Sequence, residues 1–257
     1  MGAILAPLAA LVVAAAPHAA PMPPGVSWSC DFEATYCGME EQSKAEPGRR
    51  SVFTATPRDG QLAVELTTVP RDDQVHGSGE WERDDLALPP SPAYCNEGQE
   101  EWWAVSVLFP EDYAPSVLGE VMDFHHHADG GQANFNVVAV RDHLRLHGFY
   151  GDVKRPGEYK VELGPIHRDT WYDFVYHVKW TSHGNGFFEA WLNGRQVLAH
   201  EGPTLYPGIS CYFKLANYHA PTGRPSSIVF DRVVRGTSRA AVTAERHPAS
   251  AALALTR

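Results

Sequence analysis

The segment 211–218, with the sequence CYFKLANY, brings together residues that can transfer protons and hold negative charge. In a β-strand, successive side chains point to opposite faces of the sheet. One face of this segment then carries Tyr212, Lys214, Ala216 and Tyr218, and the other carries Phe213 and Leu215, which point into a core. A small residue between an ammonium group and two phenols lets a ligand approach the sheet. The pattern favours a site for an anionic substrate; the alternative is a solvated strand face.

A second segment, 121–127, places acidic and imidazole groups on one face. If Met122 and Phe124 point into the core, Asp123, His125 and His127 share the opposite face. An imidazole titrates near neutral pH, so His125 is a candidate base. Two imidazoles at alternate positions also aim at one point and could bind a metal. Asp123 could be a third ligand, but nothing else in the sequence supplies an obvious further one, so we expect no metal. A solvated strand end is the other alternative.

Positive charge gathers on two further segments of an otherwise acidic chain. The net charge of -10 argues against affinity for nucleic acid or anionic membranes, but it allows an anionic ligand where cations are gathered locally. In segment 80–86, Arg83 and Asp85 share a face. In segment 141–147, Leu144 and Leu146 point inward, and the other face is a basic stripe formed by Arg141, His143, Arg145 and His147. A solvated surface is the alternative interpretation of this stripe.

These segments belong to a chain in which short strands follow one another. Turn signals separate the strands, and Asn193-Gly194 is a strong hairpin signal. No helical period of useful length appears. The sequence therefore predicts an all-β fold, a jelly-roll β-sandwich of two antiparallel sheets over residues 26–236, followed by a disordered tail over 237–257. The predicted strands are 51–56, 61–69, 102–109, 121–127, 133–140, 143–149, 171–180, 187–192, 211–218 and 227–234.

The amino-terminal segment and the cysteines favour a secreted protein. Residues 1–20 have the features of a signal peptide, because the apolar run is too short to span a bilayer and prolines follow it. Export permits disulfides, and the four cysteines allow three pairings. The pairing Cys30–Cys37 with Cys95–Cys211 is favoured, because the first two lie in one short loop. Buried free thiols are the alternative.

Taken together, the motifs resemble those of the jelly-roll polysaccharide lyases, a group that includes glucuronan lyases, alginate lyases and the heparin lyase I type. These enzymes share an Arg-x-Glu strand, a Gln-x-His strand and a Tyr-Phe-Lys-x-Gly-x-Tyr strand. Residues 212–218 match the third motif, with Ala216 in place of glycine. Residues 123–125 match the second with Asp123 in place of glutamine, and residues 83–85 match the first with Asp85 in place of glutamate. The similarity runs over most of residues 80–236.

The resemblance implies β-elimination at a 4-linked uronic acid of an anionic polysaccharide. The reaction must neutralise the C5 carboxylate, remove the C5 proton and protonate the leaving O4. His125 is the candidate base, and Tyr218 is the candidate acid or an alternative base. Lys214 and Arg83 are the candidate sources of positive charge. The candidate substrate-binding residues are Tyr212, Asp123, His127, Arg141, His143, Arg145 and His147.

Asp123 is the main departure from the family pattern, because an ionised carboxylate there would repel the substrate. It is protonated through burial, it orients His125, or the protein binds glycans without cleaving them. A carbohydrate-binding protein of the same fold is therefore one alternative. A glycoside hydrolase is another, but Glu120 and Asp123 point to opposite faces if their strand is regular, which argues against it. We expect a monomer without a cofactor, with calcium as a candidate structural ion.

Overall fold

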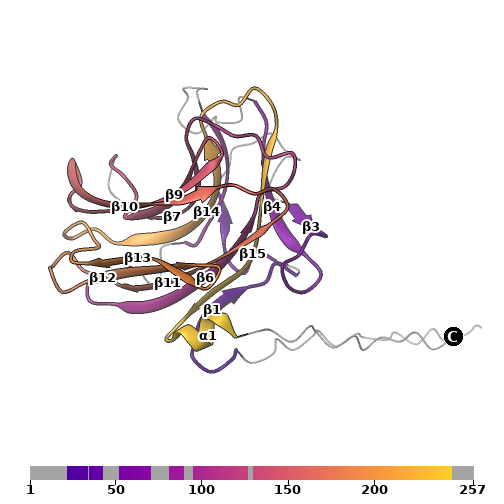
Figure 1. The fold of residues 1–257 in the computed structure, drawn as a ribbon. Helices are drawn as coiled ribbons and strands as arrows, with labels where there is room; N and C mark the ends of the chain where they lie inside the picture. Colours follow the sequence, from indigo (N-terminus) through magenta and orange to yellow (C-terminus); the bar gives the residue numbers. More distant parts are fainter. Residues whose placement is uncertain are drawn as a thin grey trace, which may run out of the picture.

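The alternation of apolar and polar residues is realised as two β-sheets that pack face to face (Figure 1). The structure is a computed structural model and describes residues 22–33, 35–42, 52–70, 81–89, 95–126 and 130–244. The predicted jelly-roll sandwich of two antiparallel sheets is confirmed. The proposed signal peptide, residues 1–20, lies outside the described residues.

We call the first sheet the back sheet. Within the described residues it has eight strands, and every pairing is antiparallel. In spatial order these are β13 (Arg195–Glu201), β12 (Phe187–Leu192), β11 (Trp171–Lys179), β6 (Glu100–Leu108), β15 (Ser226–Gly236), β4 (Ala63–Thr68) and β3 (Val52–Thr54), with β1 (Val26–Cys30) also paired to β15.

The second sheet, which we call the front sheet, contains the segments singled out for chemistry. Its seven described strands also pair antiparallel. In spatial order these are β10 (Arg155–Pro165), β9 (His143–Asp152), β8 (Phe135–Val140), β7 (Gly119–His126), β14 (Cys211–His219), β5 (Glu82–Ala87) and β2 (Glu40–Glu41).

One long strand, β10, was not predicted. Its outward residues Glu158, Lys160 and Glu162 are exposed and charged, and it lies at the edge of the front sheet. Its inward residues Tyr159, Val161 and Leu163 pack against the core and are partly buried. The signal was present, because Tyr159, Val161 and Leu163 alternate with these three charged residues over 158–163, the period of two that is typical of a half-buried strand. The strand pairs with β9.

The core between the sheets is rich in aromatic rings. The ring of Phe213 stacks on that of Trp103 at 4.9 Å, and the ring of Phe124 meets Trp103 edge-on at 5.4 Å. All three side chains are fully buried. Leu215 belongs to the same core, so the predicted inward face of segment 211–218 is confirmed.

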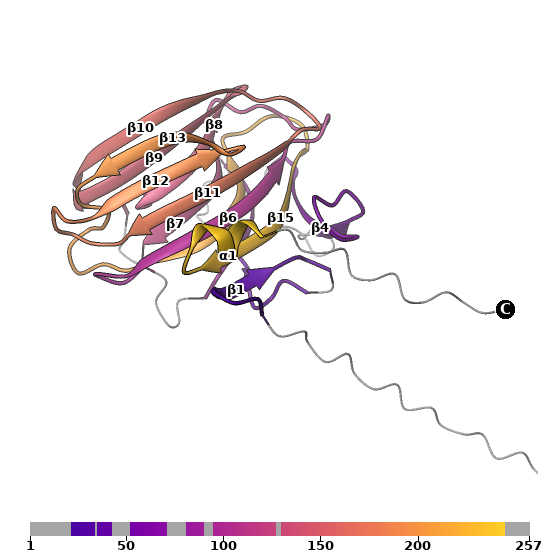
Figure 2. The same ribbon diagram turned by 60° about the horizontal axis from the view of Figure 1, so that its bottom comes forward.

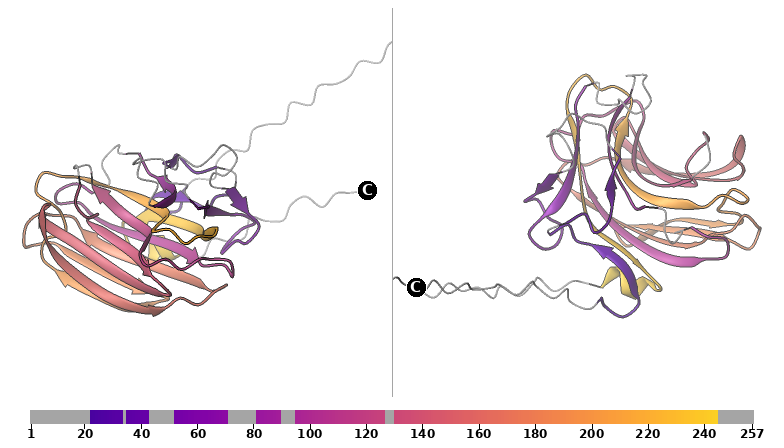
Figure 3. Two further views of the ribbon diagram at one scale, coloured as in Figure 1. Left: turned by 90° about the horizontal axis from the view of Figure 1, so that it is seen from above. Right: turned by 180° about the vertical axis from the view of Figure 1, so that it is seen from behind.

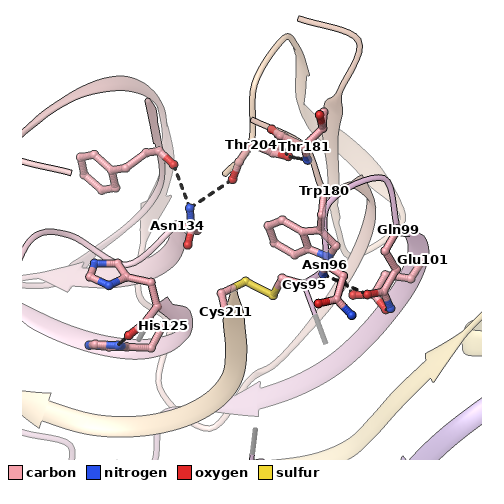
Figure 4. The surroundings of a disulfide bond; sticks show 12 residues. Cys95, Asn96, Gln99, Glu101, His125, Asn134, Trp180, Thr181, Thr204 and Cys211 are labelled. Carbon is pink, nitrogen blue, oxygen red and sulfur yellow. Dashed lines mark hydrogen bonds between the residues drawn. A yellow bond between two sulfur atoms is a disulfide. The ribbon is translucent and has the colours of Figure 1, made fainter. Parts of the chain in front are cut away.

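Both predicted disulfides are present, Cys30–Cys37 and Cys95–Cys211. The second closes a separation of 116 residues and ties the chain before β6 to the first residue of β14 (Figure 4). Closing a long loop stabilises a fold by about 2–4 kcal/mol in the chain-entropy view. Cys211 is opposite His126 in the β14–β7 strand pair. The disulfide therefore also fixes the end of β14 against β7, next to His125.

The described chain ends lie together on the outer side of the back sheet. Helix α1 (Arg239–Thr243) packs against β6, β11 and β15, and β1 lies beside it (Figures 2 and 3). The expected disordered tail is therefore ordered as far as residue 244, because Ser238 caps the helix and Val242 is buried. Residues 245–257 lie outside the described residues. No helix among the described residues is long and apolar enough to cross a membrane.

Candidate active site

A cavity of about 440 Å³ lies on the front sheet, where β5, β14, β7, β8 and β9 adjoin. Five of the residues singled out from the sequence line it: Arg83, His125, His147, Lys214 and Tyr218. They come from four strands and are far apart in the chain, so the sandwich brings them together. A smaller cavity of about 290 Å³, on the back sheet beneath α1, lacks a comparable set of phenol, imidazole and ammonium groups.

Lys214 lies at the floor of the cavity among carboxylates. Its side chain is 1% exposed, and Nζ lies 3.2 Å from Asp123 Oδ2, 3.4 Å from Asp85 Oδ2 and 3.7 Å from Glu120 Oε2. Burial alone would lower the pKa of Lys214, but the three carboxylates outweigh burial and raise the pKa above its usual value. Lys214 is therefore a fixed positive charge and not a base.

Asp123 is fully buried beside Lys214. Burial raises the pKa of Asp123 well above its usual value, and the nearby Glu120 and Asp85 add to the effect, while Lys214 opposes it. Of the three outcomes considered for this residue, the protonated carboxyl is the one that this environment favours. The expected pairing of Asp123 with His125 is not found, because the His125 ring bonds to the His126 carbonyl oxygen and Asp123 faces Lys214.

A β-bulge in β7 changes the expected direction of Glu120. The register with β8 shifts between Glu120 and Met122, so one extra residue is accommodated there and both Val121 and Met122 are buried in the core. Glu120 and Asp123 consequently lie on the same face, and both contact Lys214. The inference that these acids point to opposite faces is wrong. A paired-carboxylate hydrolysis site is still unsuited here, because Asp123 is 0% exposed and both acids must reach the sugar.

Tyr218 lies beside a guanidinium group. Arg83 is its partner across the β14–β5 pair, and the Arg83 Cζ atom is 5.0 Å from the centre of the phenol ring. Arg83 in turn makes an ion pair with Asp85, so the prediction that these two residues share a face is confirmed. The Trp81 ring packs against the Tyr218 ring, with 5.1 Å between the two ring centres. The phenol is therefore in contact with both an indole and a cation in the cavity.

His125 is a neutral imidazole at neutral pH. Burial, and then the positive charge of Lys214, lower the pKa of His125 to about 4. Its Nδ1 lies 2.8 Å from the His126 carbonyl oxygen. Because a carbonyl oxygen can only accept a hydrogen bond, Nδ1 carries the proton and Nε2 keeps a lone pair. The Tyr212 ring packs 5.6 Å from the His125 ring and does not line the cavity, so Tyr218 is the better-placed phenol.

The basic stripe on β9 is not continuous with the cavity. Leu144 and Leu146 point inward as predicted, and His147 lines the cavity. Arg145 is ion-paired with Glu162 of β10. Two further members lie away from the cavity lining, since His143 is exposed at the start of β9 and Arg141 occupies the preceding turn with a φ of 55°. His127 lies outside the described residues.

Burial also lowers the pKa of His147, whose Nδ1 is 3.4 Å from Glu158 Oε1. This imidazole is therefore a polar neutral group in the cavity and not the cation expected from the sequence. Among the described residues, no group of three or more His, Cys, Asp or Glu side chains is arranged to hold a metal ion.

Two residues of the cavity, Asn136 and Glu120, were not assigned to the site from the sequence. Both line the cavity, and Asn136 Nδ2 lies 3.5 Å from Glu120 Oε1. A signal for Asn136 was present, because it is the only polar residue in the strand FNVVAV. Glu120 was hidden by the bulge, which no periodicity argument reveals.

The fold is a jelly-roll β-sandwich whose front-sheet cavity brings together a phenol, an imidazole and two cationic side chains. The sequence matches the profile of the family described as polysaccharide lyase over residues 31–234, so the chain belongs to this family. It is a polysaccharide lyase, and its substrate is a polysaccharide. Among curated proteins, none matches the chain by sequence.

Solved structures with the same fold include lyases and a glucanase. The endo-β-1,4-glucuronan lyase of the fungus Trichoderma reesei superposes with a TM-score of 0.68 and 17% identity, over 84% of this chain and 98% of that one. An alginate lyase of polysaccharide lyase family 7 has a TM-score of 0.54 and 14% identity, over 72% and 84%. A β-glucanase catalytic domain from Podospora anserina has a TM-score of 0.52 and 13% identity, over 76% and 83%. At these identities the likeness shows the fold alone.

Proposed function

We propose that this lyase cleaves an anionic polysaccharide at a 4-linked uronic acid by β-elimination. The observation that carries the proposal is that Tyr218, His125 and Arg83 line one cavity. The reaction breaks the C5–H and C4–O4 bonds and forms a C4–C5 double bond. It requires a base, an acid and positive charge beside the C5 carboxylate, and the cavity offers a group for each.

In the proposed reaction the chain supplies an acceptor for the C5 proton and a donor for the proton that O4 receives. His125 Nε2, which has a lone pair, takes the C5 proton. The Tyr218 hydroxyl gives its proton to O4 as the C4–O4 bond breaks. Arg83 binds the carboxylate and stabilises the enolate-like charge, and Lys214 adds a fixed positive potential from the cavity floor.

The test of this proposal is the chemical nature of the product. We expect glucuronan, alginate or a glycosaminoglycan to yield oligosaccharides with an unsaturated uronyl end, detected by ultraviolet absorbance and by mass spectrometry. New reducing ends without that absorbance would identify a hydrolase. Binding to these polymers without any cleavage would identify a carbohydrate-binding protein, which is the alternative function for the same cavity.

The pH profile tests the role of His125. We expect the acid limb of kcat/KM near pH 4, because the pKa of His125 is lowered to about 4 and protonation removes the lone pair of Nε2. An unperturbed imidazole would place this limb near pH ~6.5. His125→Gln should reduce kcat/KM by about 10²–10⁴-fold and remove the limb. Retained activity in this variant would assign the role of base to Tyr218. Circular dichroism at each pH controls for unfolding.

Secretion and a monomeric enzyme are part of the same proposal. Two disulfides are compatible with an oxidising compartment, where polymeric substrates are met. The expected signal peptide over residues 1–20 predicts that the protein recovered from a culture medium begins after that segment.

A further inference from the structure

A second large cavity lies on the back sheet, away from the candidate active site. Its volume is about 410 Å³, close to the value of about 440 Å³ for the front-sheet cavity. It lies where β11 ends, β12 begins and β13 ends, and we call it the back cavity. Its volume is in the range of about 300–1,000 Å³ that is usual for ligand sites. The residues of its lining that are used below are His177, Gly184, Asn185, Phe187, Glu189 and Glu201.

Strand alternation places this lining on the outer face of the sheet. Val178 and Phe188 belong to the core between the sheets, so their neighbours His177, Phe187 and Glu189 point the other way. The front-sheet cavity is on the outer face of the other sheet. The two cavities therefore face opposite sides of the sandwich, whose two layers are seen in Figure 1.

One wall of the back cavity is aromatic and fixed in place. The Phe187 ring packs against the His177 ring, with 4.6 Å between the ring centres. The other neighbour of the imidazole is Trp102, on which it stacks at 4.0 Å. The imidazole nitrogens lie 2.9 Å from Glu189 Oε2 and 3.0 Å from Glu100 Oε1. Because this wall is preorganised, a ligand that packs on Phe187 has little protein motion to freeze.

The charges around this wall are unsuited to an acidic polymer. Among the described residues, no lysine or arginine lines the back cavity, whereas Arg83 and Lys214 line the front-sheet cavity. Glu189 and Glu201 do line the back cavity, and carboxylates repel the carboxylates of a polyuronate. The two cavities therefore differ in the ligand charge that they favour.

The back cavity is also poorly equipped to hold a cation. Glu189 is already engaged, because Oε2 is bonded to His177 and Oε1 accepts from Gln196 Nε2 at 3.2 Å. Of the two lining carboxylates, this leaves Glu201 for a ligand, and Glu201 is exposed. A single solvated carboxylate binds a cation weakly. An uncharged ligand is the one that fits this lining.

A neutral sugar ring has the groups that complement this lining. The C–H bonds on one face of a pyranose carry a small positive charge, which the negative face of the Phe187 ring attracts. The hydroxyl groups at its edge can donate to Glu201, and they can exchange hydrogen bonds with the exposed amide of Asn185.

We propose that the back cavity binds an uncharged polysaccharide, with Phe187 packing on a sugar ring and with Asn185 and Glu201 bonded to its hydroxyl groups. This site is independent of the proposed β-elimination. Because the cavities face opposite sides, both can be occupied at once. Attachment to a neutral polymer then raises the effective concentration of the enzyme near any acidic polymer mixed with it.

The test is calorimetric titration of the full chain with uncharged hexasaccharides of glucose, mannose and xylose. We expect at least one to bind, and Phe187→Ala to weaken that binding by about tenfold or more, because the ring that packs on the sugar is lost. Phe53→Ala is the matched control, since Phe53 is an exposed phenylalanine on β3, at the opposite edge of the same sheet. Absence of binding to all three sugars, or equal weakening in both variants, overturns the proposal.

A second variant blocks the back cavity without removing a packed side chain. A Cβ atom at Gly184 would meet nothing within 4 Å, so Gly184→Gln should fold and should place its side chain at the cavity. We expect this variant to lose binding of the neutral hexasaccharide as Phe187→Ala does. Wild-type affinity in the folded Gly184→Gln protein contradicts the proposal.

Charged ligands test the class of sugar. A glucuronate hexasaccharide should bind Gly184→Gln and the wild type equally, and a glucosamine hexasaccharide should bind the wild type no more tightly than the neutral sugar does. Either result reversed overturns the assignment to an uncharged ligand. The reaction is measured separately, and Gly184→Gln should keep the wild-type kcat/KM on a dissolved polyuronate. Failure of the wild type to cleave any polyuronate contradicts the proposed function and leaves the binding result unchanged.

Discussion

Tyr218→Phe is expected to reduce kcat on a polyuronate by about 10²–10⁴-fold, the usual worth of one positioned proton transfer. The substitution removes only the hydroxyl oxygen. The ring keeps its packing against Trp81 at 5.1 Å and its place beside Arg83 at 5.0 Å, so the cavity should keep its shape. We therefore expect KM to change little while kcat falls, because the lost interaction acts at the leaving oxygen in the transition state.

The matched control for this prediction is Tyr212→Phe. Tyr212 is on the same face of β14, but it packs on His125 and does not line the cavity. Loss of the Tyr212 hydroxyl should reduce kcat much less than loss of the Tyr218 hydroxyl. Both variants should unfold at the urea concentration of the wild type within experimental error. If Tyr218→Phe keeps full activity, or if the two tyrosines have equal effects, the assignment of Tyr218 as the acid is wrong.

The direction of the β14 side chains was predictable because it depends only on local alternation. Phe213 and Leu215 had to be inside, and this fixed Lys214 and Tyr218 on the other face. The same alternation correctly placed Arg83 and Asp85 on one face, where they form an ion pair. The disulfide pairing was favoured from loop length, and the resemblance to the lyases added the fold and the order of the motifs.

Long-range features were not predictable from periodicity. The bulge at Glu120 depends on how β7 fits between β8 and β14. Because of the bulge, Glu120 and Asp123 lie on one face and both contact Lys214, whereas a regular strand would place them on opposite faces. The low pKa of His125 likewise arises from burial and from the charge of Lys214 on the neighbouring strand. The positive charge that the basic stripe offers a ligand was overestimated. Arg145 is ion-paired with Glu162 of β10, a strand that was not predicted although its residues 158–163 alternate.

These features describe a site whose charges are balanced within the protein. Arg83 and Lys214 face Asp85 and Glu120, while Asp123 is held toward its protonated form. Such a buried set is costly to disturb, because each charge is desolvated and depends on the others. The cavity floor should therefore govern stability as well as catalysis, and Lys214 is the group that all three acids share.

Lys214→Met is expected to destabilise the protein by about 3–5 kcal/mol at pH 7, because it leaves Asp85 and Asp123 buried without their shared cation. Burial already raises the pKa of Asp123, and removing the opposing charge of Lys214 raises it further, so the folded variant binds more protons than the unfolded one. Its stability should consequently fall as pH rises above about 4, and the difference from the wild type should be small at pH ~4. Urea unfolding at pH 4 and pH 7 measures this difference.

A second substitution shows whether uncompensated charge is the cause of that loss. Asp123→Asn removes one acid with almost no change in volume, so the double variant Lys214→Met, Asp123→Asn should be more stable at pH 7 than Lys214→Met alone. Glu201→Gln, at an exposed position on β13 of the back sheet, should leave stability within about 0.5 kcal/mol of the wild type. A loss in Lys214→Met that is the same at both pH values would instead point to packing of the lysine chain as the source of its contribution.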